Sequence, residues 1–173
     1  MILALFFSPA ARSQEVPAEQ LKAAFLYNFV RFVDWPTNAL GPDAMPLIIG
    51  VIGNDKFANE LSNLLKDKKA HNHPLVVRKF SLTADAAGCQ AVFVADGDAK
   101  RAMQVADVTK EKPILLVGES EDFIKNGGMI SIVQDEKQKK LGFDINQQAA
   151  EKCNLIISSH LLRLARNKKG GGE

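Results

Sequence analysis

Two of the three histidines in this chain stand close enough together to suggest metal chemistry. His71 and His73 form a His-x-His pair, and on an extended segment both imidazoles would project from the same side, where they could hold zinc. His160 lies far along the chain. A single His-x-His pair in a polar stretch is more typical of a loop than of a ligand set. The sequence therefore predicts no metal site.

The glycines and acids of the chain give little support to nucleotide chemistry. The segment GVIGND, residues 50–55, has neither the dinucleotide-binding spacing nor a Walker A motif. Asp55 and Asp96 follow predicted strands, as in a phospho-receiver, but Lys112 precedes its strand, so helix caps explain these acids better. No nucleophile–base set or Gly-x-Ser-x-Gly turn stands out. We expect neither an enzyme nor a bound cofactor.

Alternating strands and helices must position these residues. The patterns predict strands at 46–53, 73–80, 89–96 and 113–119, helices at 17–33, 55–67, 98–108 and 120–127, and a hairpin over 129–145 that turns near 135–137. Asn146 and Ser158-Ser159 precede two final helices. The order predicts an α/β fold, in which a single domain has a mostly parallel central sheet, helices on both faces and a C-terminal hairpin that adds antiparallel character.

Length and charge indicate one domain that does not bind nucleic acid, and the N-terminal segment indicates export. The chain has 173 residues, with 22 basic and 20 acidic residues interspersed along it. Residues 1–13 resemble a signal-peptide remnant that lacks its positive start, with cleavage before Gln14; a strand or a cloning artefact are the alternatives. We expect the domain to span residues 14–167 and residues 168–173 to form a disordered tail.

The two cysteines of an exported chain could form a disulfide. A Cys89–Cys153 bond would close a long loop and would be worth about 4 kcal/mol if its geometry were unstrained. The alternative is two separately buried thiols, each packed against a strand or helix. The sequence leaves both open.

The helix predicted at 17–33 is apolar on more than one side. Phe25, Phe29 and Phe32 follow one helical face, whereas Leu26, Val30 and Val33 lie on others. We expect Phe29 and Phe32 to be core, and we expect Leu26, Val30 and Val33 to form a surface for a partner or a dimer. Pro36 should end the helix near Asp34, and Trp35, the only tryptophan, should pack its end against the sheet.

A double glycine in the segment FIKNGGMI, residues 123–130, predicts a specific backbone shape. Gly127 and Gly128 indicate positive φ or a close backbone approach, with Phe123 and Met129 packed beneath the turn. A helix C-cap followed by a tight turn is a sufficient explanation, so we expect shape here and not catalysis.

The chain resembles the YfiR-like family of bacterial periplasmic proteins from about Glu19 to Arg166. Three stretches in order carry the resemblance: FLYNFVRFVDWP, ILLVGESEDFIKNGGMISIV and LGFDINQQAAEKCNLIISSHLLRLAR. The matching residues, expected to be structural, are Phe29, Phe32, Trp35, Pro36, Phe123, Gly127, Gly128, Asn146, Ser158 and Ser159. Many members also have a cysteine at the position of Cys89, whereas Cys153 is less typical.

The resemblance implies a non-enzymatic regulator in the periplasm. Such a protein binds the periplasmic sensory domain of an inner-membrane diguanylate cyclase and lowers cyclic-di-GMP output and biofilm formation. An outer-membrane lipoprotein can sequester it, and members are often dimers. The alternative function is a small-ligand sensor with its pocket at the carboxyl ends of the strands, near Gly53, Asp96 and Gly118.

Overall fold

A computed structural model describes residues 16–95, 99–135 and 140–167. The signal remnant at 1–13, the tail at 168–173, Asp96 and most of the predicted hairpin turn lie outside these residues. The elements are α1 (Ala18–Phe32), β1 (Val33–Asp34), β2 (Leu47–Ile52), α2 (Asp55–Leu65), β3 (Lys69–Ala70), β4 (His73–Phe80), the 3₁₀ helix η1 (Thr83–Gly88), β5 (Ala91–Val94), α3 (Ala99–Thr109), β6 (Leu115–Gly118), β7 (Ile130–Asp135), β8 (Lys140–Ile145), α4 (Gln147–Lys152), β9 (Ile156–Ile157) and α5 (Ser159–Leu164).

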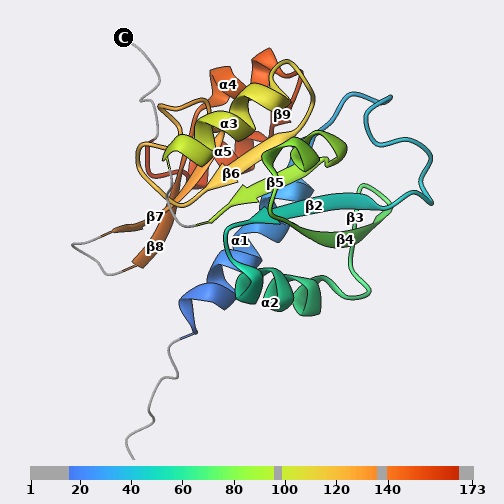
Figure 1. The fold of residues 1–173 in the computed structure, drawn as a ribbon, viewed down its shortest axis with the longest axis horizontal. Helices are drawn as coiled ribbons and strands as arrows, with labels where there is room; N and C mark the ends of the chain where they lie inside the picture. Colours follow the sequence, from blue (N-terminus) through green and yellow to red (C-terminus); the bar gives the residue numbers. More distant parts are fainter. Residues whose placement is uncertain (1–15, 96–98, 136–139, 168–173) are drawn as a thin grey trace, which may run out of the picture.

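The main sheet has seven strands in the order β3-β4-β2-β5-β6-β7-β8. The five central strands are parallel, and β3 and β8 pair antiparallel at the two edges. Counted among themselves, the parallel strands have the doubly wound order 2-1-3-4-5. Helices α1 and α2 lie together on one side of the sheet, and η1 and α3 lie together on the other (Figure 1). The predicted α/β fold with antiparallel character at the hairpin is confirmed.

Unbroken apolar runs form the centre of the sheet because both faces of a parallel sheet are covered. Every residue of β5 and of β6 is buried, and β2 is buried at all positions except Ile48. The predicted strand at 73–80 matches β4 residue for residue, but only His73 of β4 is buried, and its other residues are half-buried or exposed. This pattern fits its place next to the sheet edge, with only the short β3 beyond it.

The first helix ends earlier than predicted because the chain after it pairs with a distant segment. The residue after α1, Val33, is extended. It pairs with Ile157 in a small antiparallel sheet formed by β1 and β9, and the Ser158 N–H donates to the Phe32 carbonyl at 2.9 Å. This sheet brings α4, β9 and α5 back to the C-terminal end of α1.

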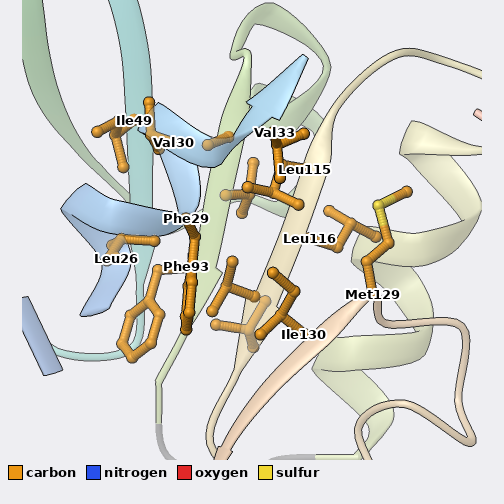
Figure 2. Packing of buried hydrophobic residues seen from close by; sticks show 14 of the residues in the cluster. Leu26, Phe29, Val30, Val33, Ile49, Phe93, Leu115, Leu116, Met129 and Ile130 are labelled. Atoms are coloured by element: carbon orange, nitrogen blue, oxygen red, sulfur yellow. The ribbon is translucent and has the colours of Figure 1, made fainter. Parts of the chain in front are cut away.

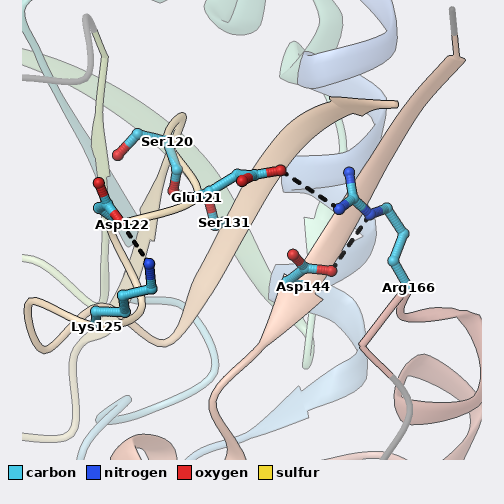
Figure 3. Close-up of polar contacts among 7 residues, drawn as sticks. All are labelled: Ser120, Glu121, Asp122, Lys125, Ser131, Asp144 and Arg166. Carbon is cyan, nitrogen blue, oxygen red and sulfur yellow. Dashed lines mark hydrogen bonds and ion pairs between the residues drawn. The ribbon is translucent and has the colours of Figure 1, made fainter. Parts of the chain in front are cut away.

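Residues 120–127 do not form the predicted short helix. They form a series of turns in which the Phe123 N–H donates to the Ser120 carbonyl and the Gly128 N–H donates back to the Phe123 carbonyl at 3.0 Å. The Ser131 hydroxyl also donates to the Ser120 carbonyl (Figure 3). A helix this short is marginal on its own, so tertiary hydrogen bonds decide its backbone.

The double glycine has both of the expected roles. Gly127 has a positive φ of 94°. Gly128 allows a close approach, because a Cβ at this position would lie 2.1 Å from the Phe123 ring. Phe123 and Met129 are buried beside this turn, as predicted.

Side-chain caps begin the last two helices, as expected from the sequence. The Asn146 side chain accepts from the Ala149 N–H at 3.1 Å, and the Ser158 hydroxyl accepts from the Leu161 N–H at 3.3 Å. Ser159 is the first, exposed residue of α5.

The chain after α5 runs along the outer edge of β8. The Arg166 N–H donates to the Phe143 carbonyl at 2.8 Å, and its guanidinium lies 3.5 Å from Asp144 and 3.6 Å from Glu121 (Figure 3). The Asn167 side-chain amide bonds both the N–H and the carbonyl of Ile145. The C-terminal segment therefore covers part of this sheet edge.

Candidate partner-binding surface

The surface predicted from Leu26, Val30 and Val33 does not exist. Each of these side chains has 0% exposure and belongs to the central hydrophobic cluster. Figure 2 shows all three among side chains of the sheet, including Ile49 and Leu115. The prediction is wrong because α1 is enclosed by the sheet on one side and contacts α2 and α5 on others. An apolar residue off the main helical stripe is therefore still core.

The aromatic residues around the helix end have different environments. Phe29 is fully buried and meets Phe143 edge to face at 4.9 Å between ring centroids. Trp35 is 9% exposed and packs edge-on against His71 at 5.7 Å, so it covers the β3–β4 turn; Pro36 beside it is half-buried. Phe32 is only half-buried, and its ring lies 5.2 Å from the imidazole of His160 on α5. The outer side of α1 is therefore partly aromatic.

A partly exposed cluster of aromatic and basic side chains covers this outer side of α1, in which Arg31 and His160 are exposed and the other members are half-buried. It consists of Tyr27, Arg31, Phe32, Lys68 and His160, which we call the α1 patch. The Arg31 guanidinium lies 5.3 Å from the centre of the Tyr27 ring and 5.6 Å from that of Phe32. The Lys68 ammonium lies 5.8 Å from the Tyr27 ring. These are cation–π distances, so the rings hold two cations at the surface.

The α1 patch carries positive charge that the described part of the chain does not neutralise. Neither Arg31 nor Lys68 has a carboxylate within 4.0 Å among the described residues. Apolar surface lies on neighbouring elements, where Ile156 of β9 is 67% exposed and Leu164 of α5 is 58% exposed. Arginine and tyrosine next to exposed apolar side chains are typical of the centres of protein interfaces.

The sequence-based prediction named residues of α1 that are buried, and the accessible aromatic and basic side chains of this helix are different ones. Tyr27 and Arg31 are four residues apart and therefore share a helical face, which is a signal the sequence contains. Lys68 and His160 come from distant segments, and only the fold brings them to this face.

The histidine pair has structural hydrogen bonds. His71 and Asn72 have positive φ angles of 51° and 68° and form the tight turn between β3 and β4. The His71 Nε2 atom is 3.0 Å from the Val30 carbonyl, and the buried His73 has its Nδ1 atom 2.8 Å from the Met45 carbonyl. No group of three metal-ligating side chains occurs among the residues that the structure describes.

Both cysteines are free and buried, which matches the alternative of two separate thiols. The Cys89 sulfur lies 3.2 Å from the position of a Cβ on Gly50 of β2. Burial raises the pKa of Cys89 to about 11, with Asp85 adding to the increase and Arg78 opposing it. Burial also raises the pKa of Cys153, which lies beside Glu111. The thiols are therefore protonated and unreactive near neutral pH.

The carboxyl edge of the sheet, the alternative site, is partly filled. The Phe123 ring occupies the space over Gly118, where a Cβ would lie 2.4 Å from it. Beyond β6, the Lys22 ammonium of α1 lies 2.6 Å from Glu119 and 2.8 Å from Glu19. Burial disfavours the charge on Lys22, but the hydrogen bonds that its ammonium group donates to both carboxylates outweigh this effect, and the pKa of Lys22 is raised. This ion-pair group ties α1 to the sheet.

Comparison with known protein families assigns the chain. The profile of the YfiR/HmsC-like family matches residues 19–166, from the second residue of α1 to the C-terminal segment that runs along β8. This chain belongs to the YfiR/HmsC-like family. The family is one of periplasmic regulators of the diguanylate cyclase pathway and is regulatory, not catalytic. No curated protein matches the chain.

Solved structures support the fold of this YfiR/HmsC-like chain. A conserved domain protein from Vibrio cholerae O1 biovar El Tor strain N16961 is 17% identical with a TM-score of 0.55. A domain from Streptococcus pneumoniae, solved in complex with L-Trp, is 14% identical with a TM-score of 0.53. Each match covers 86% of this chain but 59% of the other. At these identities the likeness shows the fold alone.

None of the described helices has the length and apolar character needed to cross a membrane.

Proposed function

We propose that this protein is a periplasmic regulator that binds the sensory domain of an inner-membrane diguanylate cyclase and represses it. Binding lowers cyclic-di-GMP and biofilm formation. The observation that carries this proposal is the α1 patch, a partly exposed cluster of rings and cations around the helix that begins the family match. In this proposal the signal remnant is removed and residues 14–167 form the active domain.

The rings hold the cations of the α1 patch in place without neutralising their charge. The Arg31 guanidinium lies over two rings at once, so little side-chain entropy remains to be lost when a partner covers it. An acidic or aromatic group on the cyclase domain could pair with Arg31 and Lys68 without first breaking an ion pair. The protein then acts by occluding or clamping the sensory domain.

Control of the repressor is part of the same proposal. An outer-membrane lipoprotein would relieve repression by covering the α1 patch, because one surface cannot hold two partners. A homodimer would form around the neighbouring apolar side chains Ile156 and Leu164, which are exposed in the single chain.

Binding of the purified protein to the cyclase sensory domain tests the patch. Arg31→Glu should weaken binding about thirtyfold or more, as expected when a central arginine is lost and its charge inverted. Lys110→Glu is the matched control, because Lys110 is exposed after α3 on the opposite side of the sheet. Thermal unfolding of both variants checks that the fold is retained.

The cellular test uses the same variants. Deletion of the gene should raise cyclic-di-GMP, Arg31→Glu should reproduce the deletion, and Lys110→Glu should not. An unchanged cyclic-di-GMP level after deletion would contradict repression of a cyclase. Loss of repression in both variants would contradict a role for the patch.

A second candidate function is a small-ligand sensor. Its support is the doubly wound strand order, because folds of this kind bind ligands beside the neighbouring strands whose following helices lie on opposite sides of the sheet. Here these strands are β2 and β5, and Gly53, with its positive φ of 93°, follows β2. The related fold from Streptococcus pneumoniae was solved in complex with L-Trp. A thermal-shift screen of free amino acids tests it, and the absence of any stabilising compound would count against a sensor.

A further inference from the structure

The outer edge of β4 is open over its second half. On the inner side, Leu75–Phe80 pair in register with β2. On the outer side, β3 pairs only with His73 and Pro74, and one further bond runs from the Leu75 N–H to the Lys68 carbonyl at 3.3 Å. Beyond Leu75, the described residues provide no backbone partner on this side. In Figure 1, β4 is followed at this edge only by the short β3.

Alternation along the strand identifies the backbone groups that face outward. The Leu75 N–H points away from β2, because it bonds Lys68. Residues two apart in a strand point their backbone groups to the same side, so Val77 and Lys79 also present an N–H and a carbonyl outward. These four groups have the spacing that an added strand requires.

The other end of the sheet shows what a covered edge is like in this protein. There the Arg166 N–H donates to the Phe143 carbonyl. The Asn167 side-chain amide accepts from the Ile145 N–H and donates to the Ile145 carbonyl. The molecule therefore uses its own C-terminal segment to cover part of the β8 edge. None of the described segments covers Val77 or Lys79 in the same way.

The side chains along the open edge determine what can pair with it. Arg78 and Lys79 are exposed, Val76 is 38% exposed, and Lys69 of β3 is exposed at the start of the same edge. Neither Arg78 nor Lys79 has a carboxylate within 4.0 Å among the described residues. The edge is thus basic, with one apolar position.

Positive charge makes a second copy of this chain a poor occupant. The symmetric antiparallel register in which Val77 pairs with Lys79 of the other copy would place Arg78 opposite its own copy. Like charges directly opposite each other destabilise a strand pair, and charged edges are a known protection against self-association. An occupant with carboxylates at alternate positions would instead be attracted.

We propose that Val76–Phe80, the open edge of β4, binds an extended acidic segment of a partner protein as an added strand. The inference is independent of the α1 patch and of the identity of the cyclase partner. Backbone hydrogen bonds to Val77 and Lys79 would supply the affinity. Carboxylates on the face of Arg78 would select an acidic sequence, because the next residue, Lys79, projects to the opposite face.

A labelled peptide tests the proposal with the full-length chain. The probe is fluorescein-Thr-Val-Glu-Val-Glu-Val-Thr, measured by fluorescence anisotropy, and its counterpart with lysine in place of glutamate is the charge control. We expect the acidic peptide to bind and the basic peptide to bind at least about tenfold more weakly. Hydrogen exchange should show new protection at the Val77 and Lys79 amides when the acidic peptide is present.

Two variants separate strand addition from simple charge attraction. Val77→Pro removes the outward N–H at an edge position, where proline is tolerated, so binding should fall at least about tenfold with little change in thermal stability. Arg78→Glu should cause a similar loss while leaving the backbone edge intact. If Val77→Pro does not fold, the hydrogen-exchange result on the parent chain alone decides.

Several results would overturn the proposal. They are the absence of binding by the acidic peptide, equal binding by folded Val77→Pro, or protection that appears elsewhere than at Val77 and Lys79. Sedimentation would reveal self-association through this edge, and a dimer that Val77→Pro dissociates would replace the acidic segment with a second copy.

Discussion

Replacement of Gly128 by alanine should damage the turn between β6 and β7 through a single added methyl group. The alanine Cβ would lie 2.1 Å and 2.2 Å from two carbons of the Phe123 ring and 2.8 Å from the Phe123 carbonyl oxygen. All three distances are far below van der Waals contact. The ring has little room to move toward Gly118, because it already lies close to the backbone of that glycine, whose Cβ position would be 2.4 Å from the ring.

The magnitude follows from the two ways in which the structure can respond. If the ring and backbone shift slightly, overpacking of this kind costs about 1–3 kcal/mol. If Phe123 leaves its site, the loss approaches that of a Phe→Ala substitution, about 3–5 kcal/mol, because the ring is only 3% exposed. We therefore expect a loss of about 3 kcal/mol, or a decrease in Tm of about 6–12 °C.

Urea unfolding followed by the fluorescence of Trp35, the only tryptophan, measures this loss. Gly88→Ala is the matched control, because a Cβ on Gly88 meets no atom within 4 Å. It should change stability by less than about 0.5 kcal/mol. A double-mutant cycle with Phe123→Ala then isolates the clash, because without the ring the added methyl group should cost much less.

Two outcomes would refute this reasoning. The first is a Gly128→Ala variant that unfolds within about 0.5 kcal/mol of the parent. The second is full additivity with Phe123→Ala, which would mean that the ring is not the obstacle.

Two further predictions concern buried titratable groups. Burial raises the pKa of Cys89 to about 11 and also raises that of Cys153, so iodoacetamide at pH 8 should label both thiols very slowly in the folded protein. In urea, both thiols should be labelled rapidly. A mass that shows a disulfide in the unreduced protein would contradict this prediction. Lys22→Met should cost about 1–2 kcal/mol near pH 7 by removing the ammonium group that lies between Glu119 and Glu19, whereas Lys125→Met, which breaks an exposed pair, should cost almost nothing. Since the folded-state pKa of Lys22 is raised, its contribution is complete below about pH 10.5 and should disappear as pH rises above that value; a pH-independent difference would contradict the ion pair.

The sequence by itself determined the main strands, most of the helices and their order. Apolar runs and helical spacing depend on neighbours along the chain, and they gave β4 residue for residue and the Asn146 and Ser158 caps. The positive φ at Gly127 was also predictable, because glycine tolerates a backbone conformation that other residues avoid. Strand–helix alternation then restricted the fold to a mostly parallel sheet.

Only the tertiary structure decided which surfaces remain exposed. Leu26, Val30 and Val33 looked available because the spacing within a helix does not record what packs against each side, and the sheet, α2 and α5 enclose α1. Residues 120–127 form turns and not a helix, and the Ser131 hydroxyl of β7 donates a hydrogen bond to the Ser120 carbonyl there. The α1 patch and the open edge of β4 depend on contacts and missing contacts between distant segments. No local pattern encodes these, because exposure is a property of the assembled chain.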